Sequence, residues 1–586
     1  MILTNTGQHK ILVKILQWTT VCSFVILTVL PLLYAIARLE SVTGINSVVA
    51  VGNFFTTQSL LEALKFTLLE ATISTIATVI IGLPIAWYLG RYNWKNIKLL
   101  RAILAVPFVT PSIVVAMGFL MLIDVGGPLT AIGIDLRLET GIVGDLANVT
   151  NWENPGHFIA LITAHVWFNI SLIMRFVEPT LSTMDRTWEE QMRFLPAGQN
   201  RLSRIRNLWL PIIGPAVLCA ATLCFIFSFT SFALVRWLTP NQDTLETMMA
   251  NSGGSAGIYG YRIDTSEIVL STSIVQLIIL SLAIIIATSI QRRHSTIHAI
   301  IAESDAKQIS DKPNTLAKSI ISLGICFAII PLVLVAIASF RIRNTTTGEF
   351  SYSTEAWSEA WSGDYSTTAI PDALSNSIIY CLITVAFALP IGWIISSCIN
   401  RLEQEKKATT AKVVEFATMI PLALSAVMIG LGILLGLLKW SPGLFGWAII
   451  PAIPHIIITT PFVIRIILPA LRSIDFSYYE QAIMLGMSPL RAWWHGKVAF
   501  LRAPLVVAGA LTMAFSLGEF GASWILVRSG SWDTLSVLID QLMSQPKFNP
   551  LIQPMAMAAA TVLMLLTFIL FFIAERFRDN GEGSGF

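Results

Sequence analysis

The chain has 586 residues, of which 55% are hydrophobic and only 12% are charged. Soluble globular domains carry about 25% charged residues, so this chain cannot cover its apolar residues with a polar surface, and the lipid bilayer must be its solvent. The formal net charge of +3 indicates no basic surface for nucleic acid. These figures exclude a water-soluble enzyme and a nucleic-acid-binding protein.

Neither the cysteines nor any other residue cluster indicates catalytic or metal chemistry. All six cysteines lie in or at the ends of apolar stretches, and none forms a Cys-x-x-Cys pair. We interpret them as small core residues. Because nucleophiles, bases and metal ligands do not cluster in the sequence, we predict no catalytic residue and no metal site on this chain.

Long apolar runs between charged or Gly/Pro-rich breaks predict the membrane spans, since a spanning helix needs about 20 apolar residues. The sequence contains twelve such runs and therefore predicts an all-α polytopic membrane protein. The expected spans are Ile11–Ala37, Ala63–Leu89, Leu100–Ile123, Phe158–Leu181, Leu208–Leu238, Ile268–Ile290, Ser319–Phe340, Ser377–Ser397, Val413–Leu438, Trp447–Leu471, Pro504–Val527 and Met555–Ala574.

The first apolar run could also be read as a signal peptide. His9, Lys10 and Lys14 precede it, and Ala35-Ile36-Ala37 resembles a cleavage site. The apolar region of a signal peptide is about 7–15 residues long, and this run is longer. We therefore expect the first span to remain as a membrane anchor.

Lys and Arg alternate between successive loops, which fixes the expected orientation by the positive-inside rule. The loops after even-numbered spans are rich in basic residues, whereas most loops after odd-numbered spans hold one. The basic residues of the rich loops include Arg91, Lys95, Lys98, Arg101, Arg186, Arg193, Arg201, Arg204, Arg206, Arg292, Arg293, Arg401, Lys406, Lys407, Arg472, Arg491 and Lys497. We expect these loops and both termini to face the cytoplasm.

The two halves of the chain repeat each other on either side of a polar connector, 291–318. Leu83-Pro84-Ile85-Ala86-Trp87 matches Leu389-Pro390-Ile391-Gly392-Trp393. A constant offset of about 290 residues then relates further pairs. These are His165 and His455, Arg175 and Arg465, Asp185 and Asp475, Glu190-Gln191 and Glu480-Gln481, and Asp243-Thr244-Leu245 and Asp533-Thr534-Leu535. We predict six-span domains at 1–290 and 319–586, joined by a cytoplasmic connector.

The two basic loops after the fourth and tenth spans are amphipathic. In the second loop, 479–486 is expected to form a short helix that a glycine closes. Its sequence resembles the coupling-loop motif of binding-protein-dependent ABC importer permeases: Glu480 and Gly486 stand at the family's spacing, and Gln481 follows the glutamate. In the first loop Glu190 aligns with Glu480, but two extra residues precede Gly198. Each motif taken alone would also fit an interfacial helix on anionic lipid.

The resemblance implies a fused, two-in-one permease with two tandem homologous six-helix type I ABC importer domains. Within that family the chain is most similar to the thiamine permeases. The segments that carry this likeness are 164–169, 225–233 and Ser516-Leu517-Gly518-Glu519-Phe520-Gly521. Ferric-iron permeases have the same fused layout and a similar Gly-Glu-Phe-Gly segment. Thiamine or its phosphate esters are therefore the first expected substrates, and ferric iron is the alternative.

The resemblance also implies the partners and the location. The chain has no Gly-x-x-x-x-Gly-Lys-Ser/Thr sequence, so ATP and Mg²⁺ are expected on partner ATPase subunits, as a homodimer, and not on this chain. An extracytoplasmic binding protein is expected to deliver the substrate. The expected location is the prokaryotic cytoplasmic (inner) membrane. From another class, an ion-coupled secondary transporter with twelve spans is the rival hypothesis, and copurification of an ATPase would separate the two.

Ionisable residues inside the spans cost about 2.5–3.5 kcal/mol each, so each needs a partner or a pathway. Glu519 lies inside the eleventh span, and its repeat equivalent is Ser231. We consider these two as possible translocation-pathway residues, with a buried Arg or His partner for Glu519 as the alternative. His165 and His455 are expected to be hydrogen-bonded core residues. Glu70 is expected to pair with Glu62, Lys65 or water.

Overall fold

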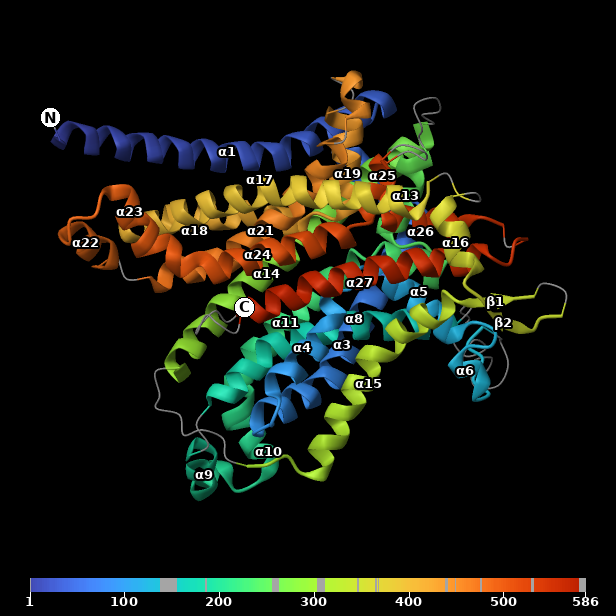
Figure 1. Ribbon diagram of the computed structural model, residues 1–586, viewed down its shortest axis with the longest axis horizontal. Helices are drawn as coiled ribbons and strands as arrows, with labels where there is room; N and C mark the ends of the chain where they lie inside the picture. Colours follow the sequence, from blue (N-terminus) through green and yellow to red (C-terminus); the bar gives the residue numbers. More distant parts are fainter. Residues whose placement is uncertain are drawn as a thin grey trace. The chain divides into compact units, whose positions relative to one another are not determined.

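The computed structural model describes residues 2–137, 155–184, 187–255, 263–302, 311–344, 347–363, 366, 368–437, 441–447, 449–474, 477–527, 532–546 and 548–578. Nearly all of these residues lie in helices (Figure 1). The long helices are α1 (Ile2–Thr43), α3 (Gln58–Arg91), α8 (Pro155–Thr183), α11 (Leu210–Phe229), α14 (Ile263–Ala302), α15 (Thr315–Ala338), α17 (Ile370–Gln404), α21 (Ile449–Ser473), α24 (Ala499–Gly518) and α27 (Ile552–Arg578).

Shorter elements connect or extend the long helices. The short helices are α2 (Ser47–Phe54), α4 (Ile97–Val109), α5 (Ser112–Ile123), α6 (Pro128–Ala131), α9 (Thr187–Phe194), α10 (Arg201–Arg204), α12 (Ala233–Leu238), α13 (Leu245–Ser255), α16 (Glu355–Ser362), α18 (Ala408–Met419), α19 (Ala426–Gly432), α22 (Ser477–Met484), α23 (Pro489–Trp493), α25 (Gly521–Leu526) and α26 (Leu535–Ser544). Strands β1 (Arg341–Arg343) and β2 (Phe350–Tyr352) form an antiparallel hairpin that pairs Ile342 with Ser351.

The helices account for the predicted spans. Eleven helices of the described chain are long and apolar enough to cross a membrane, and the bent pair Ala408–Leu422 and Ala426–Gly436 brings the number to twelve. An apolar helix satisfies every backbone hydrogen bond within itself, which is why such runs cross a bilayer. The prediction of an all-α membrane protein with about twelve spans is confirmed.

Four spans that we expected to be continuous are broken near the same places in each half. The third, Leu100–Ile123, is divided into α4 and α5, because Thr110 is extended ahead of Pro111. The ninth, Val413–Leu438, breaks at Leu424, between α18 and α19. The fifth, Leu208–Leu238, and the eleventh, Pro504–Val527, break between α11 and α12 and between α24 and α25. Hydropathy did not predict the breaks, because each lies within a long run that is apolar on average.

The helices gather into two compact units that each combine parts of both sequence halves. One unit comprises residues 1–47, 252–270 and 355–586, and the other comprises 48–251 and 271–354. Helix α1 therefore packs with α17 and α19, whereas α15 packs with α3, α4 and α5. Each half's first span thus lies in the unit built mainly from the other half. The repeat boundary at 291–318 describes the sequence and not the packing units.

Glycines allow α1 and α15, the first spans of the two halves, to lie close to the helices that they pack against. A Cβ atom on Gly118 of α5 would lie 2.7 Å from the Pro331 carbonyl oxygen of α15. In the other unit, a Cβ atom on Gly436 would lie 2.6 Å from the Pro31 carbonyl oxygen of α1. In both units, therefore, a glycine lies against the proline carbonyl of the first span of the other half.

The predicted connector, residues 291–318, is helical at both of its ends. Helix α14 continues through Ala302, so residues 291–302 extend the sixth span where a break was expected. Residues 303–310 lie outside the described residues. Asn314 then caps α15, and its side-chain oxygen accepts a hydrogen bond from the backbone N–H of Ala317.

Candidate functional site

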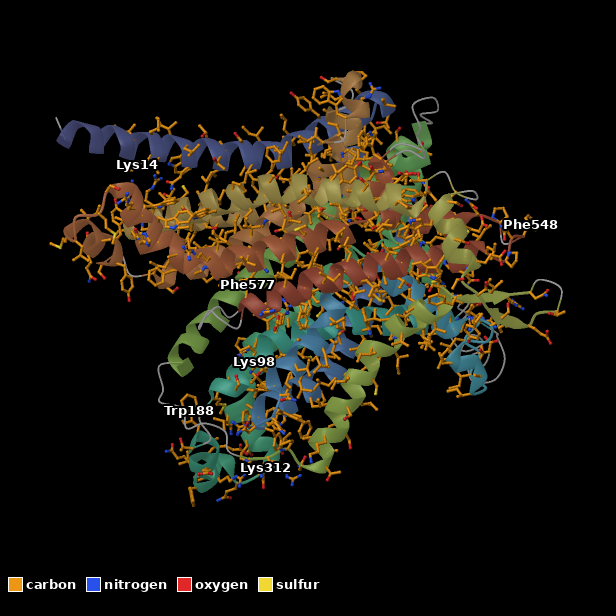
Figure 2. All side chains as sticks on the ribbon, in the orientation of Figure 1. Lys14, Lys98, Trp188, Lys312, Phe548 and Phe577 are labelled. Carbon is orange, nitrogen blue, oxygen red and sulfur yellow. The ribbon has the colours of Figure 1, made fainter. Side chains whose placement is uncertain are left out.

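The first coupling segment, residues 187–209, lies between α8 and α11. It consists of α9, a 3₁₀ turn at Pro196–Gly198, α10 and a π-helical turn at Ile205–Trp209. Glu189 and Glu190 lie in the first turn of α9, where the helix dipole favours negative charge. Trp188, in the first turn of α9, is labelled in Figure 2. The amphipathic helix expected from the sequence is present.

The second coupling segment, residues 477–498, repeats this arrangement between α21 and α24. It consists of α22, α23 and a π-helical turn at Trp494–Val498. Glu480 lies in the first turn of α22, as Glu190 does in α9. Single π-helical turns are rare in proteins and often accompany functional sites. Both coupling segments end in such a turn, at positions 289 residues apart.

Each coupling segment exposes a pair of large apolar side chains at its tip. Phe194 is 87% exposed and Leu195 is 53% exposed. Their equivalents at the offset of 290 are Met484, 88% exposed, and Leu485, 80% exposed. Contiguous apolar side chains in a polar loop mark protein interaction sites, and here the same pair is presented twice. The sequence motif identified the segments but not these residues, although the repeat offset could have found them.

The candidate coupling residues occupy different environments. Glu190, Glu480 and Gln481 are exposed. Gly486 has φ +82°, and no atom lies within 4 Å of the position that a Cβ atom would take, so it closes α22 in the left-handed conformation. Gly198 has an ordinary φ, but a Cβ atom there would lie 1.9 Å from the Met192 carbonyl oxygen. The two glycines therefore serve different purposes: one permits a turn and the other a close approach.

Arg91, at the end of α3, connects the two ends of the first coupling segment. Its Nη2 atom lies 3.0 Å from Glu189 Oε2, and its guanidinium carbon lies 5.1 Å from the centre of the Trp209 ring. Glu189 also bonds Arg193 in the next turn of α9. Arg91 was noted from the sequence only as a basic loop residue, and Glu189 was not singled out, because the motif contains Glu190.

Glu519 lies at the break between α24 and α25, and its carboxylate is fully engaged there. It accepts hydrogen bonds from the backbone N–H groups of Ala522 and Ser523 and from the Ser523 hydroxyl. His455 Nε2 lies 3.1 Å from the same carboxylate. The side chain is buried, and these contacts favour the structural alternative over a pathway role. Ser231, its repeat equivalent, lies at the corresponding break between α11 and α12.

His165, the repeat equivalent of His455, also pairs with a buried carboxylate, but from a different helix. Its Nδ1 atom lies 3.0 Å from Glu70 Oε2 and 3.1 Å from the Ser74 hydroxyl, both on α3. The expectation that Glu70 pairs with Glu62, Lys65 or water is therefore wrong, since a residue far along the sequence supplies the partner. Both histidines are buried and hydrogen-bonded, as predicted.

Among the described residues, no group of three or more His, Cys, Asp or Glu side chains is placed to hold a metal ion. The chain is thus a polytopic membrane protein whose two halves each contain broken helices and an amphipathic segment.

Residues 82–296 match the family of binding-protein-dependent transport system inner membrane components. The chain is also 24% identical over 557 residues to the thiamine transport system permease protein of Haemophilus influenzae, covering 92% of this chain and 94% of that protein. A sulfate transport system permease protein of Salmonella typhimurium is 26% identical over 186 residues, which cover 32% of this chain and 61% of that protein. A molybdenum transport system permease protein of Azotobacter vinelandii is 25% identical over 183 residues, which cover 31% of this chain and 74% of that protein. The recognition of an ABC importer permease is confirmed.

Proposed function

We propose that this permease forms the pathway by which thiamine or its phosphate esters enter the cell. The observation that carries the proposal is the extent of the likeness to the thiamine permease, which runs through both repeats and covers 92% of this chain. The sulfate and molybdenum permeases match about one third of the chain. A fused two-repeat layout is thus common to this chain and to the relative that transports thiamine.

The proposed topology places both coupling segments and both termini in the cytoplasm of a prokaryotic inner membrane. Its support is the basic content of the loops that contain the coupling segments, compared with the loops at the opposite ends of the same helices. In this orientation the β1–β2 hairpin and α16 face the outside, where an extracytoplasmic binding protein would deliver the substrate.

The proposed energy source is a pair of identical ATPase subunits, one seated on each coupling segment. Phe194 and Leu195 on one segment and Met484 and Leu485 on the other present matching apolar anchors, which supports two equivalent docking events. ATP and Mg²⁺ would then bind to the ATPase subunits. The permease contributes the surfaces that bind the ATPase subunits and the helices that move when those subunits move.

Uptake by intact cells tests the substrate. The gene is deleted, restored on a plasmid, and radiolabelled thiamine uptake is measured with a hundredfold excess of unlabelled thiamine, thiamine phosphate, sulfate, molybdate or ferric citrate. Thiamine and its phosphate are expected to suppress uptake, and the other three compounds are not. Absence of thiamine uptake, together with restored uptake of labelled sulfate, molybdate or ferric iron, would reject thiamine and identify the substrate class.

A further inference from the structure

Arg91 of α3 contacts both ends of the first coupling segment. Its ion pair with Glu189 holds the beginning of the segment in α9, and its position over Trp209 holds the end, in the π-helical turn. Trp209 also packs edge-to-face against Trp87, one turn earlier in α3, with ring centres 4.4 Å apart. The segment therefore meets α3 through a compact group of four residues.

The surroundings of Arg91 make these contacts stronger than those of a surface arginine. Its side chain is only 9% exposed, and that of Glu189 is 22% exposed. Ion pairs and cation–π contacts weaken as water surrounds them, and both gain when the cation is largely desolvated. The planar guanidinium can stack on an aromatic ring while it donates to a carboxylate, which a lysine ammonium group cannot do equally well.

Helix α3 is closely joined to the rest of its unit. A Cβ atom on Gly82 would lie 3.1 Å from Ile173 Cβ, and one on Gly90 would lie 2.9 Å from Leu181 Cβ, both in α8. Packed helices with so little space between them move as rigid bodies and do not deform locally. A displacement transmitted to Arg91 therefore moves α3 and α8 together.

In the second repeat, different residues connect the second span to the coupling segment. At the offset of 306 residues that aligns Pro84 with Pro390, the position of Arg91 is occupied by Ser397. There Trp393 of α17 stacks on Trp493 at the end of α23, with ring centres 5.8 Å apart and an interplanar angle of 9°. The tryptophan contact between second span and coupling segment is thus common to both repeats, whereas the arginine is specific to the first.

We propose that Arg91 is a positioning residue that transfers movement of the first coupling segment to α3, so that ATPase motion drives transport. The inference rests on the proposed ATP-driven function. Arg91 does not form the docking surface, because the exposed anchors Phe194 and Leu195 lie at the tip of the segment. Loss of the arginine should therefore separate ATP hydrolysis from transport while the ATPase remains bound.

The experiment uses the complete complex in proteoliposomes and measures four quantities: permease yield, copurified ATPase, ATP hydrolysis and thiamine transport. For Arg91→Gln we expect unchanged yield and unchanged ATPase content, with the number of thiamine molecules transported per ATP reduced about fivefold or more, within the usual range of coupling factors. Arg91→Lys keeps the ion pair but loses the stacking, and an intermediate ratio is expected. The double variant Arg91→Gln/Glu189→Gln should be no worse than Arg91→Gln alone.

Arg101→Gln is the matched control. Arg101 lies on α4 and pairs with Glu178 of α8 at 2.5 Å, so its loss removes an ion pair of the same unit that does not involve the coupling segment. Its transport-to-hydrolysis ratio should equal that of the wild type. A wild-type ratio in Arg91→Gln, or an equal loss in Arg101→Gln, overturns the proposal, and loss of bound ATPase in Arg91→Gln assigns Arg91 to docking instead. Failure of the wild-type permease to bind any ATPase would instead contradict the proposed function itself.

Discussion

His455 Nε2 and Glu519 Oε2 lie 3.1 Å apart across a helix break, and the same carboxylate accepts the first backbone N–H groups of α25. The other histidine nitrogen, Nδ1, lies 2.8 Å from the Ser516 hydroxyl of α24. The histidine therefore joins α21 to the helices on both sides of the break. A buried carboxylate within a membrane persists when its partners satisfy it in this way, and four contacts do so here.

Replacing Glu519 should mainly lower stability. Glu519→Ala removes the acceptor for two backbone N–H groups and one hydroxyl, and leaving buried donors unsatisfied costs about 1–3 kcal/mol each. We expect a lower thermal unfolding midpoint in detergent, with a smaller decrease for Glu519→Gln, which retains one oxygen. Glu62→Gln is the control, since Glu62 is exposed and bonds only the Gln58 side chain among the described contacts. A normal midpoint with slow thiamine transport would favour the pathway role instead.

The apolar anchors should determine ATPase binding. Met484→Asp and Phe194→Asp place a charge where an apolar partner surface is expected, and a buried interface anchor contributes about 2 kcal/mol or more. We predict a loss of copurified ATPase of about tenfold or more for either single variant. The matched control is Phe548→Asp, because Phe548 is also 88% exposed but lies in the loop between α26 and α27 (Figure 2). Retained ATPase in both coupling variants would exclude these side chains as anchors.

The two coupling-loop glycines should tolerate a small side chain to different degrees. Gly198→Ala places a Cβ atom 1.9 Å from the Met192 carbonyl, so the backbone of α9 must move. Gly486→Ala meets no neighbouring atom, and its cost is the left-handed conformation, about 1–2 kcal/mol. From the altered spacing around Pro196, the sequence predicts the milder effect at Gly198, whereas the geometry favours the opposite order.

Transport by Gly198→Ala and Gly486→Ala measures this difference directly. Gly486→Asn is an informative third variant, because asparagine tolerates the left-handed region better than alanine does. We expect transport to decrease in the order Gly486→Asn, Gly486→Ala, Gly198→Ala. A larger defect in Gly486→Asn than in Gly198→Ala would show that the turn at Gly486 does more than close the helix.

The ion pair that holds α1 to the end of α17 should resist acidification. Hydrogen bonds from Lys407 and Lys14 lower the pKa of Glu405 to about 2 from its ordinary value of 4.5. A depressed carboxyl pKa stabilises the folded state above pH 4.5, and this contribution is lost as the pH falls toward 2. Between pH 8 and 5, the difference in unfolding midpoint between wild type and Lys14→Gln should stay constant. A difference that shrinks within this interval would contradict the assignment.

Hydropathy predicted the spans well because the bilayer constrains the sequence directly. Residues in lipid must be apolar, and their backbone must be helical. It did not predict the breaks at Thr110 and Glu519, since a broken helix among protein neighbours remains apolar on average over its length. The repeat predicted that His165 and His455 would lie in equivalent environments. It could not identify their carboxylate partners, because Glu70 and Glu519 come from different helices of the repeat.

Short motifs predicted the coupling segments because those motifs depend on local structure. Glu480 and Gly486 lie within two helical turns, so their spacing determines local structure. The role of Arg91 depends on contacts with Glu189 and Trp209, about a hundred residues away in sequence, and no local pattern contains them. Exposure of Phe194 and Met484 also depends on packing, because an apolar residue in an amphipathic loop is equally compatible with burial.

The packing of α1 with α17 and α19 has a consequence for biosynthesis. Helix α1 leaves the ribosome before α17, because Ile370, where α17 begins, is synthesised about 330 residues after the end of α1, which takes roughly 15–70 s at ordinary translation rates. During that time the part of α1 around Pro31 lacks its native neighbour, since Gly436 does not yet exist. Helix α1 therefore finds its native neighbours long after its own synthesis.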